Sequence, residues 1–548
     1  MNKIESLFKK NKLPVIIAVI QWFITTILQV DRAFFVYNNE NKILIIIKLL
    51  YLIFLIVIWC FLNNCYKKIK NEDPDYKRGF QIFCVHFFLM MVLLLILWPG
   101  TWSLDDLWTL EALRHYRSFF PWQHILTGIY QDVLLQVLPF PGGIIFLQNV
   151  LVSLCIAFSV MKLEKVFKIK QIKKCFIDIL LKILPFLFPP VLMYQFSGYR
   201  MGLYIYLELV MIVLLICAYK EKQKWSWKYT LLLSILTIIV STWRTESFVY
   251  IPCVSILLFL VPRDSISNRK KIFSVLFIIF GFINLNHYQN HALNDSDYQI
   301  ISLLRPGAAL VRMADYVDDS KELAIINKVT DVKIIRDNPS LNGEQLYWKT
   351  KCVKNRNNNH DDYYSNEDYY NYLKAFIKLS LKYPIVVVSE RWNLFMRGAG
   401  ITGDSYNNVT GAARLFEKNN GNNAAKVTLD RGWIANSPVL KNARKSVVYA
   451  FGGMKSDGTR IYMLKQLMWN AIIPIIMLLG YWIRTLIKKE WFYFIIFSAI
   501  VFKLLVVVLT QPSPWLMYLL SFYLLGYTLL TYQAWIYFSQ MKDVKEDE

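Results

Sequence analysis

Long apolar stretches, repeated from one end of the chain to the other, constrain the fold more than any other feature of the sequence. A helix needs about 20 apolar residues to cross the hydrocarbon core of a bilayer. Of the 548 residues, 55% are apolar. We therefore expect an all-α polytopic membrane protein with about 12 transmembrane helices, near residues 13–30, 43–62, 80–98, 143–160, 175–193, 202–219, 229–242, 247–262, 272–287, 463–483, 491–510 and 514–537. Proline and glutamine interrupt 121–140, which is expected to be a re-entrant or interfacial helix.

The net charge of +23 is explained by topology. Its lysines and arginines gather in alternate loops such as "YKKIKNEDPDYKR" and "MKLEKVFKIKQIKK". By the positive-inside rule these loops face the cytoplasm, which places both termini there. The first apolar run does not end in a small-residue cleavage site, so it is expected to be a retained signal-anchor. A nucleic-acid partner is not expected. The eight cysteines lie mostly in or beside apolar runs, without CxxC or zinc spacing, so neither a disulfide nor a zinc site is predicted.

The loops divide the chain into four predicted parts. Two accessory transmembrane helices occupy 1–79, and the transmembrane core occupies 80–287, with an outer catalytic loop at 98–124. Residues 288–462 predict an α-rich extracytoplasmic domain, inserted before a last part, 463–548, with three transmembrane helices and a cytoplasmic tail. The cytoplasmic loops are too short for a nucleotide-binding domain. An enzyme of this class must therefore take an activated substrate from the membrane or from outside.

The outer loop "WPGTWSLDD" carries two adjacent carboxylates, Asp105 and Asp106, beside the end of an apolar run. One interpretation is structural: Ser103 caps the following helix and Asp106 completes a capping box. A carboxylate at a helix N-terminus is stabilised in its ionised form, which suits a general base or a metal ligand. Asp105 and Asp106 are thus candidate catalytic residues, and with Glu246 they are candidate ligands for a divalent cation such as Mg²⁺ or Mn²⁺.

Further candidates lie in the other outer loops. Arg244 and Glu246 in "WRTES", and Arg200 in "SGYRMG", stand where apolar runs meet. An arginine offers a planar fork to phosphate, although an interfacial ion pair and snorkelling are the structural alternatives. Supporting candidates are Glu111, His115 in "LRHYRS" and His124 in "PWQHILTG", each histidine also being compatible with a structural role.

These motifs together resemble the glycosyltransferase C superfamily (GT-C), whose bacterial multi-pass members use polyprenyl-phosphate sugar donors. The match rests on "WPGTWSLDD", "PWQHILTG", "WRTES" and "LKYP", over roughly 80–510. Two features depart from the family: "YRMG" stands where relatives often carry a Lys-Asp pair, and two helices precede the usual core.

The resemblance implies transfer of a sugar to an extracytoplasmic acceptor hydroxyl, on a cell-envelope glycan, a lipid-linked glycan or a teichoic-acid-like polymer. Asp105 would act as the base with Asp106 as its partner or as a metal ligand. Arg244 and Arg200 would bind the donor phosphate, and Glu246 would orient Arg244 or join the metal site.

Three other functions remain open at this point. A lipid-linked polysaccharide polymerase or ligase also has about a dozen helices and a late outer loop, but relies more on arginines. A transporter or flippase usually carries ionisable residues at mid-bilayer or broken helices in matching halves. A scaffold of envelope assembly would tolerate replacement of both Asp105 and Asp106.

Overall fold

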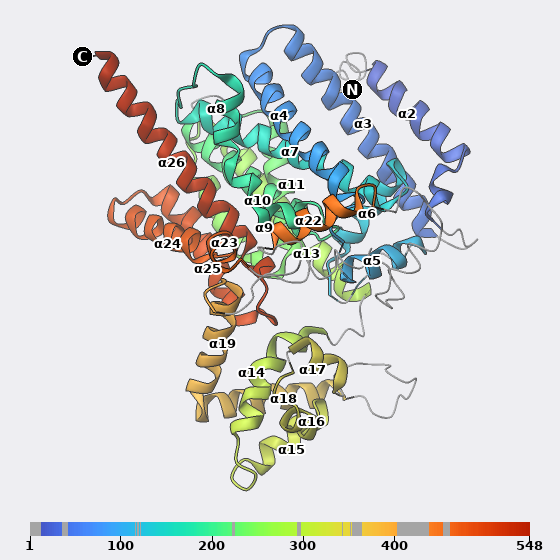
Figure 1. Ribbon diagram of the computed structural model, residues 1–548, viewed down its shortest axis with the longest axis vertical. Coiled ribbons are helices and arrows are strands. Elements are labelled where there is room, and N and C mark those ends of the chain that lie inside the picture. The colour runs from blue at the N-terminus through green and yellow to red at the C-terminus, as the bar shows by residue number, and fades with distance from the viewer. Residues whose placement is uncertain are drawn as a thin grey trace.

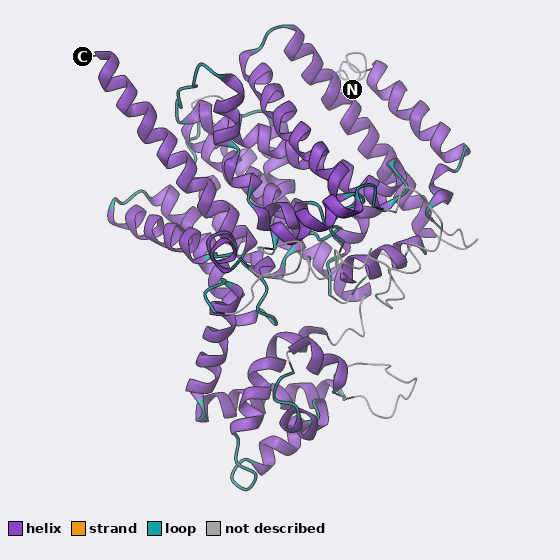
Figure 2. Cartoon of the chain, viewed as in Figure 1, coloured by secondary structure: helices purple, strands orange, loops and turns teal. Residues whose placement is uncertain are grey.

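The computed structural model is built from helices. It describes residues 12–35, 42–102, 104–115, 117, 120, 122–221, 225–292, 298–341, 343–350, 352, 364–402, 438–452 and 461–547. Within these ranges there is no β-strand, only one isolated bridge between Phe120 and Gln123. Figure 2 shows a large helical body and a smaller group of helices below it. The prediction of an all-α membrane protein is confirmed.

Seven helices in the described part of the chain are long and apolar enough to cross a membrane. They are α3 (Lys42–Lys70), α4 (Pro74–Leu97), α7 (Pro141–Val166), α10 (Met201–Lys220), α13 (Asn268–Ala292), α24 (Ile472–Ile487) with the preceding α23 (Tyr462–Met468), and α25 (Trp491–Thr510). Shorter apolar helices pack among them: α2 (Lys12–Ile27), α6 (Ile125–Val137), α11 (Trp227–Trp243), and η3 (Thr245–Val249) with α12 (Tyr250–Leu260). The last helix is α26 (Leu520–Asp547), preceded by η8 (Leu516–Tyr518). The larger number of twelve spans stays a prediction.

The predicted span at 175–193 is not a continuous helix. It consists of α8 (Cys175–Lys182), η2 (Leu184–Leu187) and α9 (Pro189–Gln195). Proline stands at the start of both later pieces. Because proline lacks the N–H that would bond the preceding turn and its ring clashes with that turn, the preceding helix ends there. The stretch 121–140 contains α6, whose 13 residues are too few to cross a bilayer in full.

The lysine-rich end of α3 and the start of α5 (Leu104–Arg114) lie at opposite ends of the helical body. The turn between α3 and α4, together with α8, is on the upper side of Figure 1, where α2 begins and α26 ends. On that side Arg78 of α4 bonds Glu164 of α7 at 2.7 Å and also pairs with Asp178 of α8. Lys182 bonds the same two carboxylates at 2.7 and 3.0 Å. This buried network of balanced charge ties three helices together.

Part of the predicted extracytoplasmic domain, 288–462, has a hydrophobic core of its own. Its own core joins η4 (Tyr298–Ile300), α14 (Ile301–Met313), α15 (Ser320–Val329), α16 (Val332–Asp337), α17 (Gly343–Lys349) and α18 (Asn366–Lys382). α19 (Pro384–Gly398) leads from this domain to α25. The "KYP" motif serves this fold, because Lys382 and Tyr383 both bond Asp319, at 2.6 and 2.8 Å. It therefore supplies no side chain to a site in the membrane region.

The helix α22 (Lys441–Phe451), which was expected in the outer domain, packs on α4 instead. Its buried Arg444 donates hydrogen bonds to the carbonyl oxygens of Leu97 and Gly100, at 3.3 and 2.8 Å. This contact covers the "WPG" turn, and α5 (Leu104–Arg114) begins a few residues after that turn. α22 thus packs on the end of α4, and the domain boundary at 462 stays a prediction.

Gly100 holds a conformation that side chains rarely adopt. Its φ is +123°, and a Cβ at this position would lie 2.6 Å from the carbonyl oxygen of Phe196. We expect Gly100→Ala to destabilise the protein by about 1–3 kcal/mol. The measurement is thermal unfolding in detergent, with Gly480→Ala as control because nothing lies within 4 Å of a Cβ there. Equal unfolding temperatures for the two variants would contradict the prediction.

Candidate functional site

A cavity of about 730 Å³ opens at the end of the helical body that faces the outer domain. It lies where the ends of α11, α13 and α25 meet the start of α10 and the first residues of the outer domain. Of the residues predicted from the sequence, five line this cavity: Asp105, His124, Arg200, Arg244 and Glu246. Loops that are far apart in the sequence thus form one site.

The two adjacent carboxylates of α5 are held by one turn and have different surroundings. The Ser197 hydroxyl donates to Asp106 at 2.7 Å, and the Tyr199 hydroxyl donates to Asp105 at 2.9 Å. Asp106 is buried and is not among the residues that line the cavity, whereas Asp105 lines it. Burial raises the pKa of Asp105, opposed by the Tyr199 hydroxyl and the charge of Arg200. A raised pKa suits a group that must accept a proton near neutral pH.

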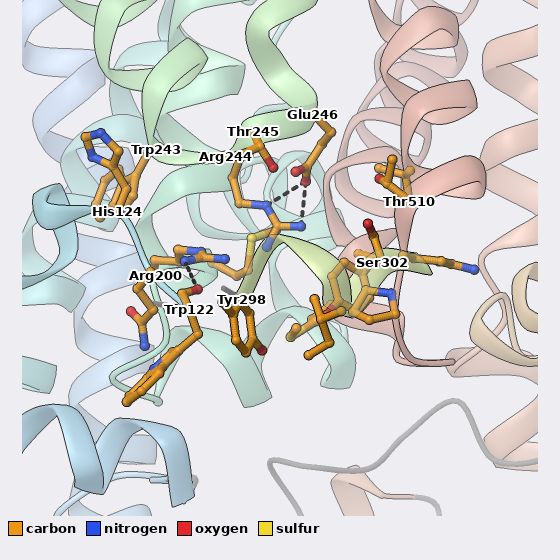
Figure 3. A pocket seen from close by; sticks show the side chains of 18 of the residues that line it. Trp122, His124, Arg200, Trp243, Arg244, Thr245, Glu246, Tyr298, Ser302 and Thr510 are labelled. Carbon is orange, nitrogen blue, oxygen red and sulfur yellow. Dashed lines mark hydrogen bonds and ion pairs between the residues drawn. The ribbon is translucent and has the colours of Figure 1, made fainter. Parts of the chain in front are cut away.

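Two guanidinium groups lie together in the cavity, as Figure 3 shows. Arg244 is paired with Glu246, with a distance of 2.6 Å between Nε and Oε1. Arg200 donates to the carbonyl oxygen of Trp122 at 3.2 Å, and no carboxylate of the described residues forms an ion pair with it. Burial and the neighbouring Arg244 lower the pKa of Arg200 to about 10, so it stays charged at neutral pH. Arg200 is therefore the cation available to an anionic ligand.

The loop that precedes α6 forms another wall. His124 caps α6 by accepting a hydrogen bond from the Leu126 amide at 3.3 Å, and burial and Arg200 lower its pKa to about 4. Gln289 of α13 fixes this loop by accepting from the Ile125 amide at 2.8 Å. His124 is thus a neutral, structurally engaged group at neutral pH.

Several buried polar atoms at the cavity wall have no hydrogen-bond partner among the described residues. They are Nε1 of Trp122, Oε1 of Gln123, Nε2 of His124, and both amide atoms of Gln511. Buried polar atoms in proteins are nearly always paired. The wall of the cavity therefore holds polar atoms whose hydrogen-bonding capacity the described residues do not use.

Three predicted candidates do not reach the cavity. Asp106 is fixed to Ser197, and Glu111 pairs with Arg114 at 3.0 Å, while His115, in the turn just after α5, lies 3.7 Å from Glu111. Ser103, the expected helix cap, lies outside the described residues. Because both Asp105 and Asp106 are bonded to the 197–199 turn, the pair anchors α5 as well as supplying Asp105 to the cavity.

The predicted cation site is not assembled. Asp105, Asp106 and Glu246 bond Tyr199, Ser197 and Arg244, respectively, and so turn to three different partners. No group of three or more His, Cys, Asp or Glu side chains in the described part of the chain is arranged to hold a metal ion. The residues present thus do not fit a divalent cation, and we derive no chemical step through one.

The sequence did not single out Glu344, Tyr298 and Gln511, which also line the cavity. Glu344 begins the short helix α17 and Tyr298 lies in η4, both in the inserted domain. Burial and the charge of Asp105 raise the pKa of Glu344 to about 8. Gln511 lies in "QPSPW", a short polar stretch between two apolar runs, and that position is the signal from which it could have been predicted.

No family model, curated protein or solved structure matches this chain. Its function is therefore argued from the chemistry of the cavity.

Proposed function

We propose that this protein is an integral-membrane glycosyltransferase, which moves a sugar from a polyprenyl-phosphate donor to an extracytoplasmic acceptor hydroxyl. The observation that carries the proposal is that one cavity holds both Asp105 and Arg200. Asp105 is suited to accept a proton, and Arg200 is a cation with no carboxylate partner among the described residues. The cavity lies at the end of membrane-length helices, where a lipid-borne phosphate and a polar acceptor can meet.

Each part of the transfer has a residue suited to it. The acceptor hydroxyl loses its proton to the Asp105 carboxylate as its oxygen bonds to the anomeric carbon. The bond from that carbon to the phosphate oxygen breaks, and the electron pair leaves with the polyprenyl phosphate. Arg200 and Arg244 stabilise the charge that develops on the phosphate, and Glu246 holds Arg244 in place through its ion pair.

This proposal includes a location and a topology. The protein lies in the cell membrane with about 12 spans, both termini in the cytoplasm and the cavity on the outer face. Supporting it, the lysine-rich turn between α3 and α4 lies on the side of the body opposite the cavity. The partners are the lipid bilayer, the lipid-linked donor and a glycan acceptor.

Arg200 provides a test of donor binding. We expect Arg200→Gln to raise the KM for the donor by about 10–100-fold, because a charged hydrogen bond to phosphate is lost. Arg200→Lys keeps the charge without the fork and should fall between this variant and the wild type. The assay measures transfer from labelled polyprenyl-phosphate sugars to extracted envelope glycans in membranes.

Arg484→Gln is the matched control, since Arg484 is an exposed arginine in the last turn of α24. Loss of transfer in the control, or an unchanged donor KM in Arg200→Gln, would contradict the phosphate-binding role. Wild-type membranes that transfer no sugar from any polyprenyl-phosphate donor, but join preassembled lipid-linked glycans, would favour a polymerase or ligase.

A further inference from the structure

Glu344 is a second carboxyl group in the cavity, and it comes from the inserted domain. It lines the cavity with Tyr298 and Ser302 of the same domain, so that domain forms one of the walls. The adjoining Gly343 lies close to the 511–515 loop, since a Cβ there would be 3.2 Å from the carbonyl oxygen of Pro512. α17 is therefore pressed against the membrane body at the point where Glu344 enters the site.

The surroundings of Glu344 do not provide a counter-ion. No lysine, arginine or histidine among the described residues lies within ion-pair distance of its carboxyl group, although 15 such pairs are formed elsewhere. The charge that acts on Glu344 is that of Asp105, which with burial outweighs the opposing effect of the Ser513 hydroxyl on its pKa, and the other titratable groups that face it are the phenols of Tyr298 and Tyr518. A partly buried carboxyl beside a like charge is costly for stability, so an interaction with something that enters the cavity explains its position better than a role in the fold.

We propose that Glu344 is an acceptor-binding residue, which holds a hydroxyl group of an uncharged polyol acceptor in the cavity shared with Asp105. This inference rests on the proposed function. Hydroxyl groups can hydrogen-bond with both carboxyl groups, whereas the negative charge of Asp105, which already acts on Glu344, would repel a phosphate-bearing acceptor at this wall. The guanidinium groups of Arg200 and Arg244 lie at the part of the cavity assigned to the donor phosphate.

Kinetics with separately varied donor and acceptor test this role. Glu344→Ala is expected to raise the acceptor KM about tenfold or more and to leave the donor KM unchanged. Glu344→Gln, which keeps the size and one acceptor atom, should show a smaller increase. Glu367→Gln is the matched control, because Glu367 is exposed on α18 of the same domain. Equal changes in both KM values, or none, would overturn the proposal.

A labelling experiment on the intact protein tests the site without requiring transfer. Dicyclohexylcarbodiimide adds to a protonated carboxyl in an apolar setting and leaves a stable N-acylurea, which peptide mass spectrometry locates. Because the pKa of Glu344 is raised to about 8 by burial and by Asp105, labelling is expected below that pH and should fall as the pH rises through it. Glu344→Gln should lose the label.

Protection from labelling then identifies the ligand class. Methyl α-glucoside, methyl α-mannoside and methyl β-galactoside are the uncharged probes, and glycerol 3-phosphate is the anionic one. Protection by an uncharged probe alone supports the proposal. Protection by glycerol 3-phosphate alone, or by none of the probes, or an absence of label on Glu344, overturns it. Protection by a glycoside in a protein that transfers no sugar leaves the polyol site standing and refutes the glycosyltransferase function.

Discussion

Replacing Asp105 by asparagine is expected to lower the rate of sugar transfer by about 10²–10⁴-fold, the usual contribution of a general base. Asparagine keeps the size of the side chain and an oxygen that can accept from the Tyr199 hydroxyl, so α5 should hold its position. What it removes is the group that takes the acceptor proton. The loss should therefore appear in kcat, with the donor KM little changed and the amount of protein in the membrane unaffected.

The neighbouring carboxylate provides the matched control. Asp106→Asn makes the same chemical change one residue along, in a side chain that bonds Ser197 and does not line the cavity. This variant should keep most of its transfer activity. If only Asp106→Asn were inactive, the base would have to be moved to that residue. If both variants transferred normally, the carboxylates would serve only to anchor α5. The polymerase, transport and scaffold functions would then be favoured over the glycosyltransferase.

The sequence was sufficient to predict the class of fold and five residues of the cavity. Apolar runs indicate which segments cross the bilayer, and loop charges indicate which side each loop faces. The loops predicted to share the outer side could therefore be grouped from the sequence. That grouping brought together Asp105, Arg200 and Arg244. It could not separate Asp105 from Asp106, because their difference depends on Ser197 and Tyr199, which are more than 90 residues away along the chain.

The contribution of the inserted domain could not be predicted for the same reason. Glu344 stands in "NGEQLYWK", an ordinary polar stretch whose helix places an acidic residue in its first turn. Its place in the cavity depends on how the domain packs against the 511–515 loop, which is a tertiary contact. The partner of the "KYP" motif could not be predicted either, because its lysine and tyrosine bond Asp319, about 60 residues before them in the chain.

A lysine within an apolar run is another feature whose meaning required the structure. Lys503 is buried in the middle of α25, where its ammonium donates to Glu208 of α10 at 2.7 Å. It also donates to the Tyr204 hydroxyl at 3.0 Å and to the Ser521 hydroxyl at 3.1 Å, while Tyr250 donates to the same oxygen of Glu208. Four helices therefore meet at one ion pair inside the apolar body.

This ion pair is connected to the cavity. The Tyr204 hydroxyl is also bonded to that of Ser247, which follows Glu246 in the segment that carries the Arg244–Glu246 pair. Loss of one charge would leave the other buried without a counter-ion, and breaking such a pair typically costs about 3–5 kcal/mol. Lys503→Met should therefore destabilise the protein by that amount, and it should weaken donor binding by loosening the segment that holds Arg244.

Adding Glu208→Gln to Lys503→Met separates the effect of an unpaired buried charge from the effect of lost packing. With Glu208→Gln added to Lys503→Met, no charge is left unpaired, and the amide oxygen can still accept from Tyr250. The double variant should recover most of the stability lost in Lys503→Met, as measured by unfolding in mixed micelles of increasing SDS content. If Lys503→Met were as stable as the wild type, or if the double variant were the less stable of the two, the ion pair would not be what joins these four helices. Recovery of both stability and donor KM would show that the intramembrane charges act on the site by holding its arginine.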